Sequence, residues 1–248
     1  MPGIKTLIRN FFPEKLKGFN QIKKYFKNNA GLEIGGPSEI FNRRKYIPVY
    51  PLIKRLDGVN FSSSTIWENR ITKGFTYKFS KRVSPGYQYI EEGANLSVIK
   101  DDTYDFILAS HSLEHIANPL KALKEWLRVL KRGGVLLAIL PDKRYTFDHK
   151  RPVTAFGHLL EDYRNNTQED DLTHVDEIRS LHDLDLDPGI INKDDFPSRC
   201  LDNINNRCLH HHIFDTKLLR ETFTHLNLEI LSTDFSPPYH QIILGIKK

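Results

Sequence analysis

Short apolar runs alternate with amphipathic stretches along the chain from residue 31 to residue 141. Each apolar run is brief and is bounded by glycine or by polar turn residues, which favours a strand. The last run is apolar at every position, and this is typical of a central parallel strand that is covered on both faces. We predict strands at residues 31–35, 58–62, 104–110 and 135–140.

Two other stretches have helical spacing. Asn118 is placed to cap a helix that begins at Pro119, because asparagine at the N-cap and proline at the first position both favour a helix start. The leucines that follow form one apolar face, and Gly133-Gly134 is expected to end the helix. Asp215 is a similar N-cap for a second helix, which runs to Leu226.

The chain ends in two predicted strands, residues 228–235 and 241–247, with a short turn between them. A short turn permits antiparallel pairing, whereas a parallel crossover needs a dozen residues or more. The strands and helices that alternate before this pair predict a mostly parallel sheet with helices on both faces. We therefore expect an α/β fold with an antiparallel last strand.

Residues 1–29 precede this pattern and form a basic segment. Apolar residues recur in it at roughly helical spacing, with a break at Pro13. Residues 1–27 contain seven Lys or Arg and one acid, a net charge of +6, whereas the rest of the chain sums to −1. The main interpretation is one or two helices packed on the domain with solvated lysines. Docking on an anionic membrane, gating of the acceptor and a homodimer contact are the alternatives.

Within the domain at residues 30–248, residues 142–212 form a polar insertion. At about 70 residues it is too long for an ordinary loop, and such segments usually carry function, here acceptor binding or a lid. Its central part, residues 161–195, contains twelve acids and three Lys or Arg. A uniformly basic surface is therefore excluded, and we expect no nucleic-acid partner.

The composition limits the class of protein further. No run approaches 18 apolar residues, so no transmembrane helix is expected. The N-terminus has no apolar core followed by a small-residue cleavage site, which argues against a secretory signal. Two cysteines, Cys200 and Cys208, cannot form a disulfide scaffold. We expect a cytoplasmic protein, which residues 1–29 can hold at the inner face of the membrane.

Ligands of open α/β sheets bind beyond the carboxyl ends of the parallel strands. This rule places residues 33–38, Asn60, Asn95, residues 110–115 and residues 141–149 around one crevice. Gly35 and Gly36 would let the backbone approach a ligand closely. The sequence there has neither the G-x-G-x-x-G pattern nor a P-loop lysine, which argues against NAD and ATP.

The segment 104–134, YDFILASHSLEHIANPLKALKEWLRVLKRGG, resembles class I S-adenosylmethionine-dependent methyltransferases of type 11. It is similar to their fourth strand, the EH turn, the next helix and the R-V-L-K-P-G-G entry to the fifth strand, with Arg132 in place of the usual proline. The similarity covers about residues 31–141, the last helix and the last two strands. It implies a Rossmann-like sheet of seven strands, methyl transfer and S-adenosylmethionine as the cofactor.

The same resemblance implies a cofactor site. Residues 33–38 are similar to the first motif of the family, although Pro37 stands where a second glycine is common. Asn60 takes the place of the acid that binds the ribose hydroxyls, and Asn95 that of an acid that often contacts the adenine; both can instead be simple turn residues. The residues expected at the cofactor are Glu33, Gly35, Gly36, Pro37, Ser38, Asn60, Asn95, Leu96, Ser110 and His111.

A closer resemblance is to a subgroup of methyltransferases found in bacterial surface-glycan biosynthesis. Residues 33–38, 141–149 (PDKRYTFDH) and 206–212 (NRCLHHH) carry it. It implies O-methylation of a sugar hydroxyl in a capsule or lipopolysaccharide-type glycan or in its nucleotide-sugar precursor. Methylation of another small molecule, or a non-catalytic binding protein that keeps the fold, are the alternatives.

All eleven histidines lie at or after residue 111, in the half that should face the acceptor. A sugar hydroxyl is a poor nucleophile, so a base within hydrogen-bond reach speeds the transfer, and histidine titrates near the working pH. His111 follows the strand at 104–110, and Asp148-His149 follows the strand at 135–140. We predict His149, His182 or His111 as the base, with Asp148 as an orienting carboxylate; structural roles are the alternative.

Basic residues after the strand at 135–140 can hold an anionic acceptor such as a nucleotide-sugar phosphate, because arginine offers a bidentate fork. Pairing with the acidic insertion is the equal alternative. The residues concerned are Lys143, Arg144 and Arg151.

Two patterns raise the question of a metal. Residues 210–212 are three histidines that follow Cys208, but adjacent residues point in different directions and zinc ligands are usually spaced. The alternating Asp183, Asp185 and Asp187 could bind Mg²⁺, although a solvated acidic loop is the simpler interpretation. We expect no metal.

Overall fold

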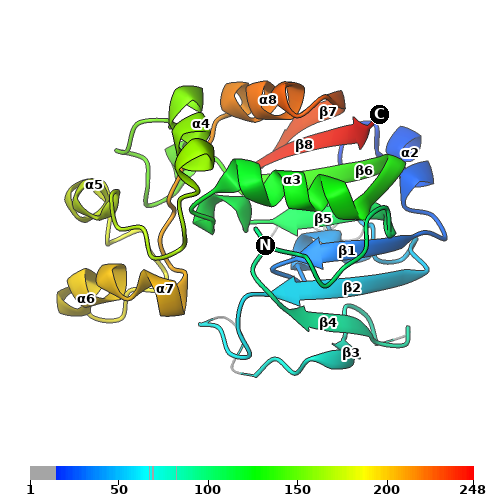
Figure 1. Ribbon diagram of the computed structural model, residues 1–248, viewed down its shortest axis with the longest axis horizontal. Coiled ribbons are helices and arrows are strands. Elements are labelled where there is room, and N and C mark those ends of the chain that lie inside the picture. The colour runs from blue at the N-terminus through cyan, green and yellow to red at the C-terminus, as the bar shows by residue number, and fades with distance from the viewer. Residues whose placement is uncertain (1–14, 67, 69, 82) are drawn as a thin grey trace, which may run out of the picture.

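Eight strands form one sheet within the residues that the computed structural model describes, which are 15–66, 68, 70–81 and 83–248. The strand order is β3-β4-β2-β1-β5-β6-β8-β7 (Figure 1). β1, β2, β4, β5 and β6 pair in parallel, and β8 lies antiparallel between β6 and β7. The strands are β1 (Ala30–Ile34), β2 (Arg55–Asn60), β3 (Gly74–Tyr77), β4 (Gly86–Ile90), β5 (Tyr104–Ser110), β6 (Leu130–Pro141), β7 (Leu228–Ser236) and β8 (His240–Lys247). The predicted α/β class and the antiparallel last strand are confirmed.

The edge of the sheet differs from the prediction. β3 is an additional strand that pairs antiparallel with β4, so the sheet has eight strands in the described residues instead of seven. β2 was predicted at 58–62 and forms at 55–60. The strand begins earlier because Asp57, although charged, is fully buried and accepts hydrogen bonds from Tyr87 N at 2.8 Å and Tyr104 Oη at 2.8 Å. A buried carboxylate with one donor on the neighbouring strand β4 and another on β5 is stable in the sheet interior.

The two predicted long helices are present, and their predicted caps are confirmed. Asn118 Oδ1 accepts from Lys121 N at 3.0 Å, and Asp215 Oδ1 accepts from Leu218 N at 2.7 Å. The helices are α2 (Phe19–Ile22), α3 (Pro119–Val129), α4 (Phe156–Asn165), α5 (Val175–Leu181), α6 (Phe196–Leu201), α7 (Asn203–Asn206) and α8 (Thr216–His225). Short 3₁₀ turns lie at Lys23–Tyr25, Glu39–Phe41, Leu113–His115, Lys143–Tyr145 and Lys193–Asp195.

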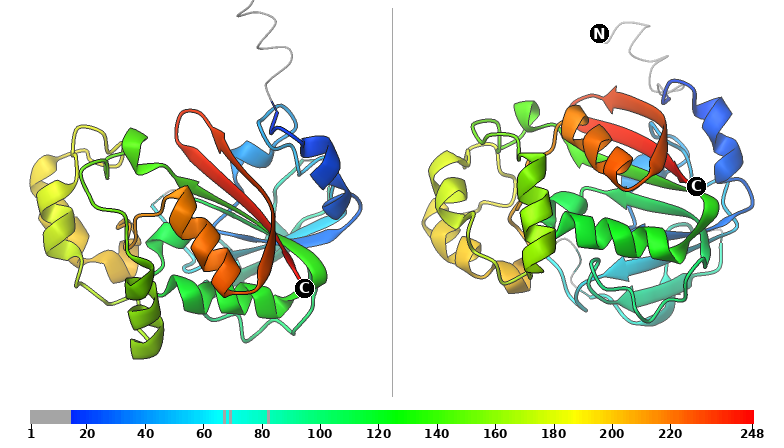
Figure 2. Two further views of the ribbon diagram at one scale, coloured as in Figure 1. Left: turned by 90° about the horizontal axis from the view of Figure 1, so that it is seen from above. Right: turned by 45° about the horizontal axis from the view of Figure 1, so that its top comes forward.

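The two faces of the sheet are covered differently. α3 and α8 pack on one face, where Trp126 and Phe223 are fully buried (Figure 2). The other face is covered by α2, the turn after it and residues 35–54, which contain one 3₁₀ turn and no α-helix. Phe26 and Phe41 fill this second core. Helices therefore lie on both faces as predicted, but those on the second face are short.

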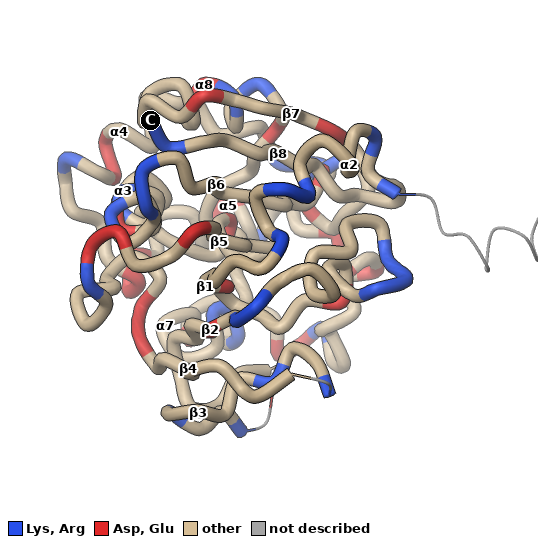
Figure 3. Tube along the Cα trace, turned by 90° about the vertical axis from the view of Figure 1, so that its right-hand side faces the viewer, with Lys and Arg blue, Asp and Glu red and all other residues tan. Residues whose placement is uncertain are grey.

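The described part of the basic segment, residues 15–29, packs on the sheet. Leu16, Phe19, Ile22 and Phe26 are buried, whereas the lysines between them are exposed. Figure 3 shows these positive charges before and after α2 and on neighbouring loops. This packing agrees with the main interpretation of the segment, in which helices pack on the domain and the lysines are solvated. Pro13 and the other residues up to 14 lie outside the described part. Membrane contact and a homodimer stay predictions, and within the described residues no helix has the length and apolar character needed to cross a membrane.

The insertion, residues 142–212, contains α4 to α7 and lies beyond the carboxyl ends of β1, β2 and β5 (Figure 1). It has a small apolar cluster of its own, made by Val175, Ile178, Phe196, Cys200 and Leu209. The insertion thus lies at the end of the sheet at which ligands of α/β proteins bind.

Candidate functional site

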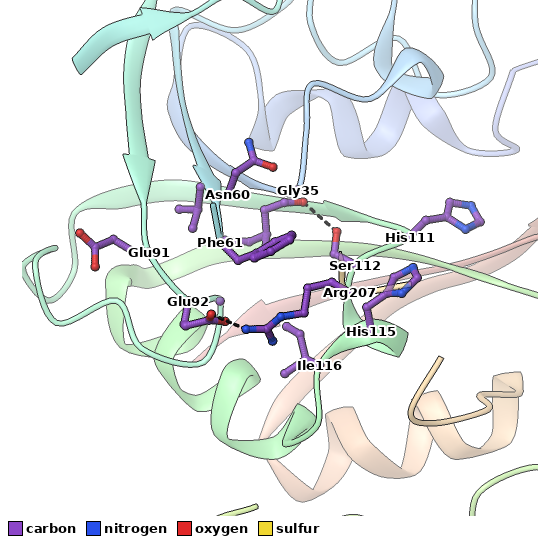
Figure 4. Close-up of a pocket in the computed structure, with 13 residues that line it drawn as sticks. Gly35, Asn60, Phe61, Glu91, Glu92, His111, Ser112, His115, Ile116 and Arg207 are labelled. Carbon is purple, nitrogen blue, oxygen red and sulfur yellow. Dashed lines mark hydrogen bonds and ion pairs between the residues drawn. The ribbon is translucent and has the colours of Figure 1, made fainter. Parts of the chain in front are cut away.

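A cavity of about 340 Å³ opens at the carboxyl ends of β1, β2, β4 and β5. Its size is within the usual range for small-molecule sites. Residues from the strand ends and from the 3₁₀ turn after β5 form most of its wall (Figure 4). The lining residues are Ile34, Gly35, Val59, Asn60, Phe61, Glu91, Glu92, Gly93, His111, Ser112, His115, Ile116 and Arg207.

The floor of this cavity depends on the glycine after β1. Gly35 has φ +73°, and a Cβ built there would lie 2.7 Å from Ser112 Oγ. Ser112 Oγ donates to Ile34 O at 2.8 Å, so the turns after β1 and β5 are held together. A side chain at position 35 would be strained and would fill space beside the cavity.

The polar groups of the cavity come from two strand ends. Asn60 is buried at the end of β2, where its Nδ2 donates to Gly36 O at 3.4 Å. Glu91 and Glu92 directly follow β4. Glu91 pairs with Lys73 at 3.0 Å at the rim, and Glu92 pairs with Arg207 at 2.6 Å. Two carboxylates and an amide therefore line the cavity at the ends of β2 and β4.

Arg207 belongs to the insertion and yet lines this cavity. Figure 4 shows its guanidinium beside Glu92, with Phe61 and Ile116 nearby. The guanidinium carbon lies 5.0 Å from the centre of the Phe61 ring, and Nη1 lies 2.5 Å from Glu169 Oε2. Burial raises the pKa of Glu169 to about 7, although Arg207 acts in the opposite direction. Arg207 thus ties the insertion to the edge of the cavity.

These residues fit S-adenosylmethionine. Ile34, Val59 and Ile116 offer apolar surface for a flat base, and Asn60, Glu91 and Glu92 offer hydrogen-bond acceptors for hydroxyl and amino groups. Gly35 has no side chain, so the backbone there leaves room for the extended part of the cofactor. The cofactor would therefore rest against the ends of β1, β2 and β4.

The residues expected at the cofactor divide into two sets. Gly35, Asn60 and His111 line the cavity. The remaining seven lie outside its lining, and Asn95 borders a separate shallow surface beside α3. Phe61, Glu91, Glu92 and Arg207 line the cavity without having been predicted. Ser112 and His115 also line it; they belong to the segment 110–115 that was placed around the crevice, but they were not among the residues expected at the cofactor. The strand-end rule could have indicated Glu91 and Glu92 if β4 had been recognised.

Glu33 supports the cavity from the opposite face of β1. Its carboxylate is fully buried and accepts from the hydroxyls of Tyr50 and Tyr77, each at 2.7 Å, and from Ser38 N at 3.0 Å. Burial raises the pKa of Glu33, although these hydrogen bonds act in the opposite direction. Through Ser38, the carboxylate fixes the loop that begins at Gly35.

A second cavity, of about 560 Å³, adjoins the first. His111 and His115 line both cavities. The other walls come from the turn after β6, from the insertion, from the β7–β8 turn, from the 3₁₀ turn after β5 and from the loop after β2. They comprise Ile66, Glu114, Pro141, Tyr145, Thr146, Phe147, Leu186, Asp187, Pro188, Gly189, Arg199, Cys208, His210 and Tyr239.

His111 lies where the two cavities meet. It has φ +53°, a conformation that non-glycine residues rarely adopt outside functional or tightly held positions. Its Nε2 is 2.8 Å from His240 Nδ1, and its Nδ1 is 3.5 Å from Glu114 Oε1. Burial lowers the pKa of His240 to about 4, and this holds the His240 ring in its neutral form at physiological pH.

His210 faces the second cavity and is held by a carboxylate. His210 Nδ1 lies 2.5 Å from Asp148 Oδ2, which leaves Nε2 on the opposite edge of the ring. Burial lowers the pKa of His210, but the Asp148 carboxylate outweighs burial and the pKa is raised. Burial raises the pKa of Asp148, but His210 and Arg151 together lower it to about 2. Asp148, the predicted orienting carboxylate, therefore contacts His210, a histidine that was not predicted as the base.

The other two predicted bases lie outside the lining of both cavities. His149 is part-exposed, and its Nε2 is 2.9 Å from Asp183 Oδ2. His182 is buried, lies 3.0 Å from Asp187 Oδ2 and stacks on Phe147 with ring centroids 4.4 Å apart. His182 can thus shape the second cavity through Phe147 and Asp187.

The predicted anion-binding residues contact other groups of the protein. Arg151 is buried and binds Asp148 and Glu177, at 3.1 and 2.8 Å. Arg144 pairs with Asp142 at 2.5 Å, and Lys143 Nζ donates to the carbonyl of Arg151. The cation that lines the second cavity is Arg199, which lies 3.0 Å from Asp187.

The three adjacent histidines point to different partners, as expected. His210 contacts Asp148, His211 lies 3.0 Å from Asn203 Nδ2, and His212 lies 2.9 Å from Asp162. The acidic loop pairs with cations: Asp183 with Lys150, Asp185 with Lys193 and Asp187 with Arg199. Among the described residues, two groups have ligand atoms close enough to hold a metal: Glu114, His115 and His210, and His158, His174 and His212.

Residues 54–138 match the family model of a methyltransferase domain. This methyltransferase domain includes β2 to β5, α3 and most of β6, and so it contains three of the four strand ends that form the first cavity. The match supports the predicted methyltransferase resemblance over residues 54–138, and S-adenosylmethionine is the cofactor that such a domain implies. The predicted domain bounds of 30–248 stay a prediction.

Two curated relatives match part of this chain. An uncharacterized protein of Methanocaldococcus jannaschii is 31% identical over 129 residues, which are 48% of this chain and 57% of the relative. The ubiquinone/menaquinone biosynthesis C-methyltransferase UbiE of Campylobacter jejuni is 31% identical over 65 residues, 26% of this chain and 28% of the relative. The chain thus spans less than two thirds of either relative.

Solved structures share the fold over nearly the whole chain. An S-adenosylmethionine-dependent methyltransferase of Mesorhizobium loti has a TM-score of 0.54 at 11% identity and covers 93% of this chain and 96% of its own. A protein of Pyrococcus horikoshii has a TM-score of 0.50 at 16% identity, with coverages of 100% and 93%. The Rossmann-like fold around the methyltransferase domain is therefore confirmed.

Proposed function

We propose that this protein is an S-adenosylmethionine-dependent O-methyltransferase that acts on a sugar hydroxyl of a bacterial surface glycan or of its nucleotide-linked precursor. The observation that carries the proposal is the wall shared by the two cavities. His111 and His115 line both, so a cofactor in the first cavity and an acceptor in the second would meet beside the same side chains.

The chemistry of the second cavity supports a sugar acceptor. Tyr145, Phe147 and Tyr239 offer aromatic surface to the C–H faces of a sugar ring. Asp187, Arg199 and His210 offer acceptors and donors for its hydroxyls. Arg199 is also placed to pair with a phosphate, a role that the sequence suggested for other basic residues.

The chain's own residues align the reactants and move one proton. S-adenosylmethionine supplies a methyl group that is already activated, so alignment of the acceptor oxygen is the main requirement. His210, held by Asp148 at Nδ1, is the residue that we assign as base, because it can take the hydroxyl proton at Nε2. His111 at the junction can orient the acceptor oxygen.

Calorimetric titration tests the first part of the proposal. We expect S-adenosylmethionine and S-adenosylhomocysteine to bind the full chain with one site each. Gly35→Val should abolish both, because a side chain there would be strained and would crowd Ser112. Gly157→Val is the matched control, since a Cβ at Gly157 would meet open space. If neither ligand binds at millimolar concentration, only the alternative of a non-catalytic protein with this fold remains.

A labelled-methyl assay tests the acceptor. With radiolabelled S-adenosylmethionine, we expect transfer to nucleotide-sugars or to extracted surface glycan, and none to DNA or RNA. Label that enters only quinone-like or other small molecules would support the alternative acceptor class. If the protein binds the cofactor but transfers label neither to sugars nor to other small molecules, the sugar assignment is contradicted and the binding of the cofactor is not.

A further inference from the structure

Four potential ligands converge inside the insertion, away from both cavities. His158 and Asp162 lie one turn apart on α4, His174 precedes α5, and His212 lies in the segment between α7 and α8. None of the four lines either cavity, and the proposed transfer reaction uses none of them.

The distances within this cluster suit one metal ion. His158 Nε2 lies 3.0 Å from His174 Nε2 and 3.5 Å from Asp162 Oδ2, and His212 Nε2 lies 2.9 Å from Asp162 Oδ2. The ligand atoms of the three histidines lie within 4.8 Å of one another. Around a tetrahedral zinc ion with bonds of about 2.0–2.1 Å, neighbouring ligand atoms lie roughly 3.3 Å apart.

The surroundings orient the carboxylate. Asp162 Oδ1 accepts from Thr167 Oγ1 at 3.0 Å, so Oδ2 is left to face the imidazoles. The backbone carbonyl of Asp162 accepts from Asn118 Nδ2 at 2.8 Å, which anchors α4 to the start of α3. Metal ligands are commonly held by such outer hydrogen bonds. His212 is buried, whereas His158 and His174 reach the surface in part, so an ion could enter.

The position of the cluster explains what an ion would do. The insertion has a small apolar cluster of its own, and small modules often need a metal or another cross-link for stability. An ion bound here would join α4, the start of α5 and the segment that leads to α8. Four protein ligands without an open position are the mark of a structural site.

We propose that His158, Asp162, His174 and His212 form a structural site for a divalent transition metal, with zinc as the best fit. Imidazole and carboxylate ligands in a four-coordinate arrangement favour zinc over Mg²⁺ or Ca²⁺, which prefer oxygen ligands in larger number. The site stabilises the insertion, and through it the wall of the second cavity.

Elemental analysis of the full chain, purified without chelator, tests the site. We expect about one zinc per chain in the wild type, and a visible absorption band of tetrahedral Co²⁺ after replacement of zinc by cobalt. His158→Ala with His174→Ala should remove both signals. His225→Ala is the matched control, because His225 ends α8 and belongs to neither cluster; it should keep both signals. Thr167→Val is a milder variant that should weaken zinc affinity by about tenfold.

Thermal unfolding gives a second readout, which starts from the wild type. Chelation should lower the Tm of the wild type, and zinc should restore it, whereas the double variant should not respond to either. A wild type without metal would overturn the proposal and leave a hydrogen-bonded histidine network. Zinc that persists in the double variant but is lost in His115→Ala would also overturn it, because the ion would then belong to the group at Glu114.

Discussion

His210 is buried between a carboxylate on one edge of its ring and the second cavity on the other. Because the Asp148 carboxylate raises the pKa of His210, the ring is protonated at low pH and cannot accept a proton there. We expect kcat to rise with pH through a pKa above 6.5, the ordinary value for histidine. Initial rates measured from about pH 5 to about pH 9, a range that brackets the ordinary histidine pKa of roughly 6.5, check this.

Asp148→Asn tests the dyad more directly. Loss of the carboxylate should move the limb of the pH profile to lower pH, and it should reduce kcat by roughly 10²-fold or more because the ring is no longer oriented. Asp183→Asn is the matched control, since Asp183 makes the equivalent contact with His149 outside both cavities. An equal loss in Asp183→Asn would restore His149 as the base.

The residues that sequence reasoning placed correctly in the cavity follow strands with plain apolar patterns. Gly35 and His111 come directly after β1 and β5, and Asn60 ends β2, so the strand-end rule could place them. Arg207 and His210 could not be placed in this way, because they approach the strand ends from an insertion without a regular pattern. Glu33 was assigned to the cofactor by its motif, yet its partners are Tyr50 and Tyr77 on the other face.

At the scale of elements, α7 ends at the edge of the first cavity, where Arg207 pairs with Glu92 and Glu169. Arg207→Ala would leave both carboxylates without that partner and would free the insertion from the cavity edge. We expect the Kd for S-adenosylhomocysteine to rise by about tenfold or more, as for loss of a buried ion-pair partner. Calorimetry of the variant and of Glu92→Gln, which removes the same pair from the other side, checks this.

The comparison for this prediction is Lys73→Ala. Lys73 pairs with Glu91 at the same rim, but half of its side chain is exposed. Exposed pairs contribute little, so cofactor affinity should change by less than about threefold. If Lys73→Ala and Arg207→Ala weaken binding equally, charge at the rim matters and contact with the insertion does not.

Elements with strong local signals formed as predicted, and those without them were missed. α3 and α8 have capping side chains and one apolar face, and both are present. β4 reads Gly-Tyr-Gln-Tyr-Ile, where polar positions interrupt the apolar ones, and β3 is an edge strand with two exposed residues. Their pairing with β2 and with each other decides their conformation, and a single sequence does not display that pairing.

For the whole molecule, residues 15–29 complete the core on the second face of the sheet. Removal of residues 1–29 would expose the surface that Leu16, Phe19 and Phe26 cover. Burial of each large side chain contributes about 1.5–3 kcal/mol. We therefore expect a large fall in Tm, measured by circular dichroism, and not only a loss of localisation.

A charge-reversal variant separates packing from membrane contact. Lys17→Glu with Lys23→Glu and Lys24→Glu changes exposed positions only, so Tm and cofactor affinity should stay at wild-type values. Sedimentation with anionic liposomes then reports on the membrane prediction alone. Binding that persists unchanged in this variant would contradict docking through the basic segment.

The insertion contacts the first cavity through Arg207 and forms part of the second through Asp187, Arg199 and His210. Any ligand that orders the insertion at one cavity therefore changes the affinity of the other, and the two effects must be equal by thermodynamic linkage. This reciprocity offers a way to identify the acceptor without detecting its methylated product. Among candidate sugars, the true acceptor should be the one that tightens binding of S-adenosylhomocysteine.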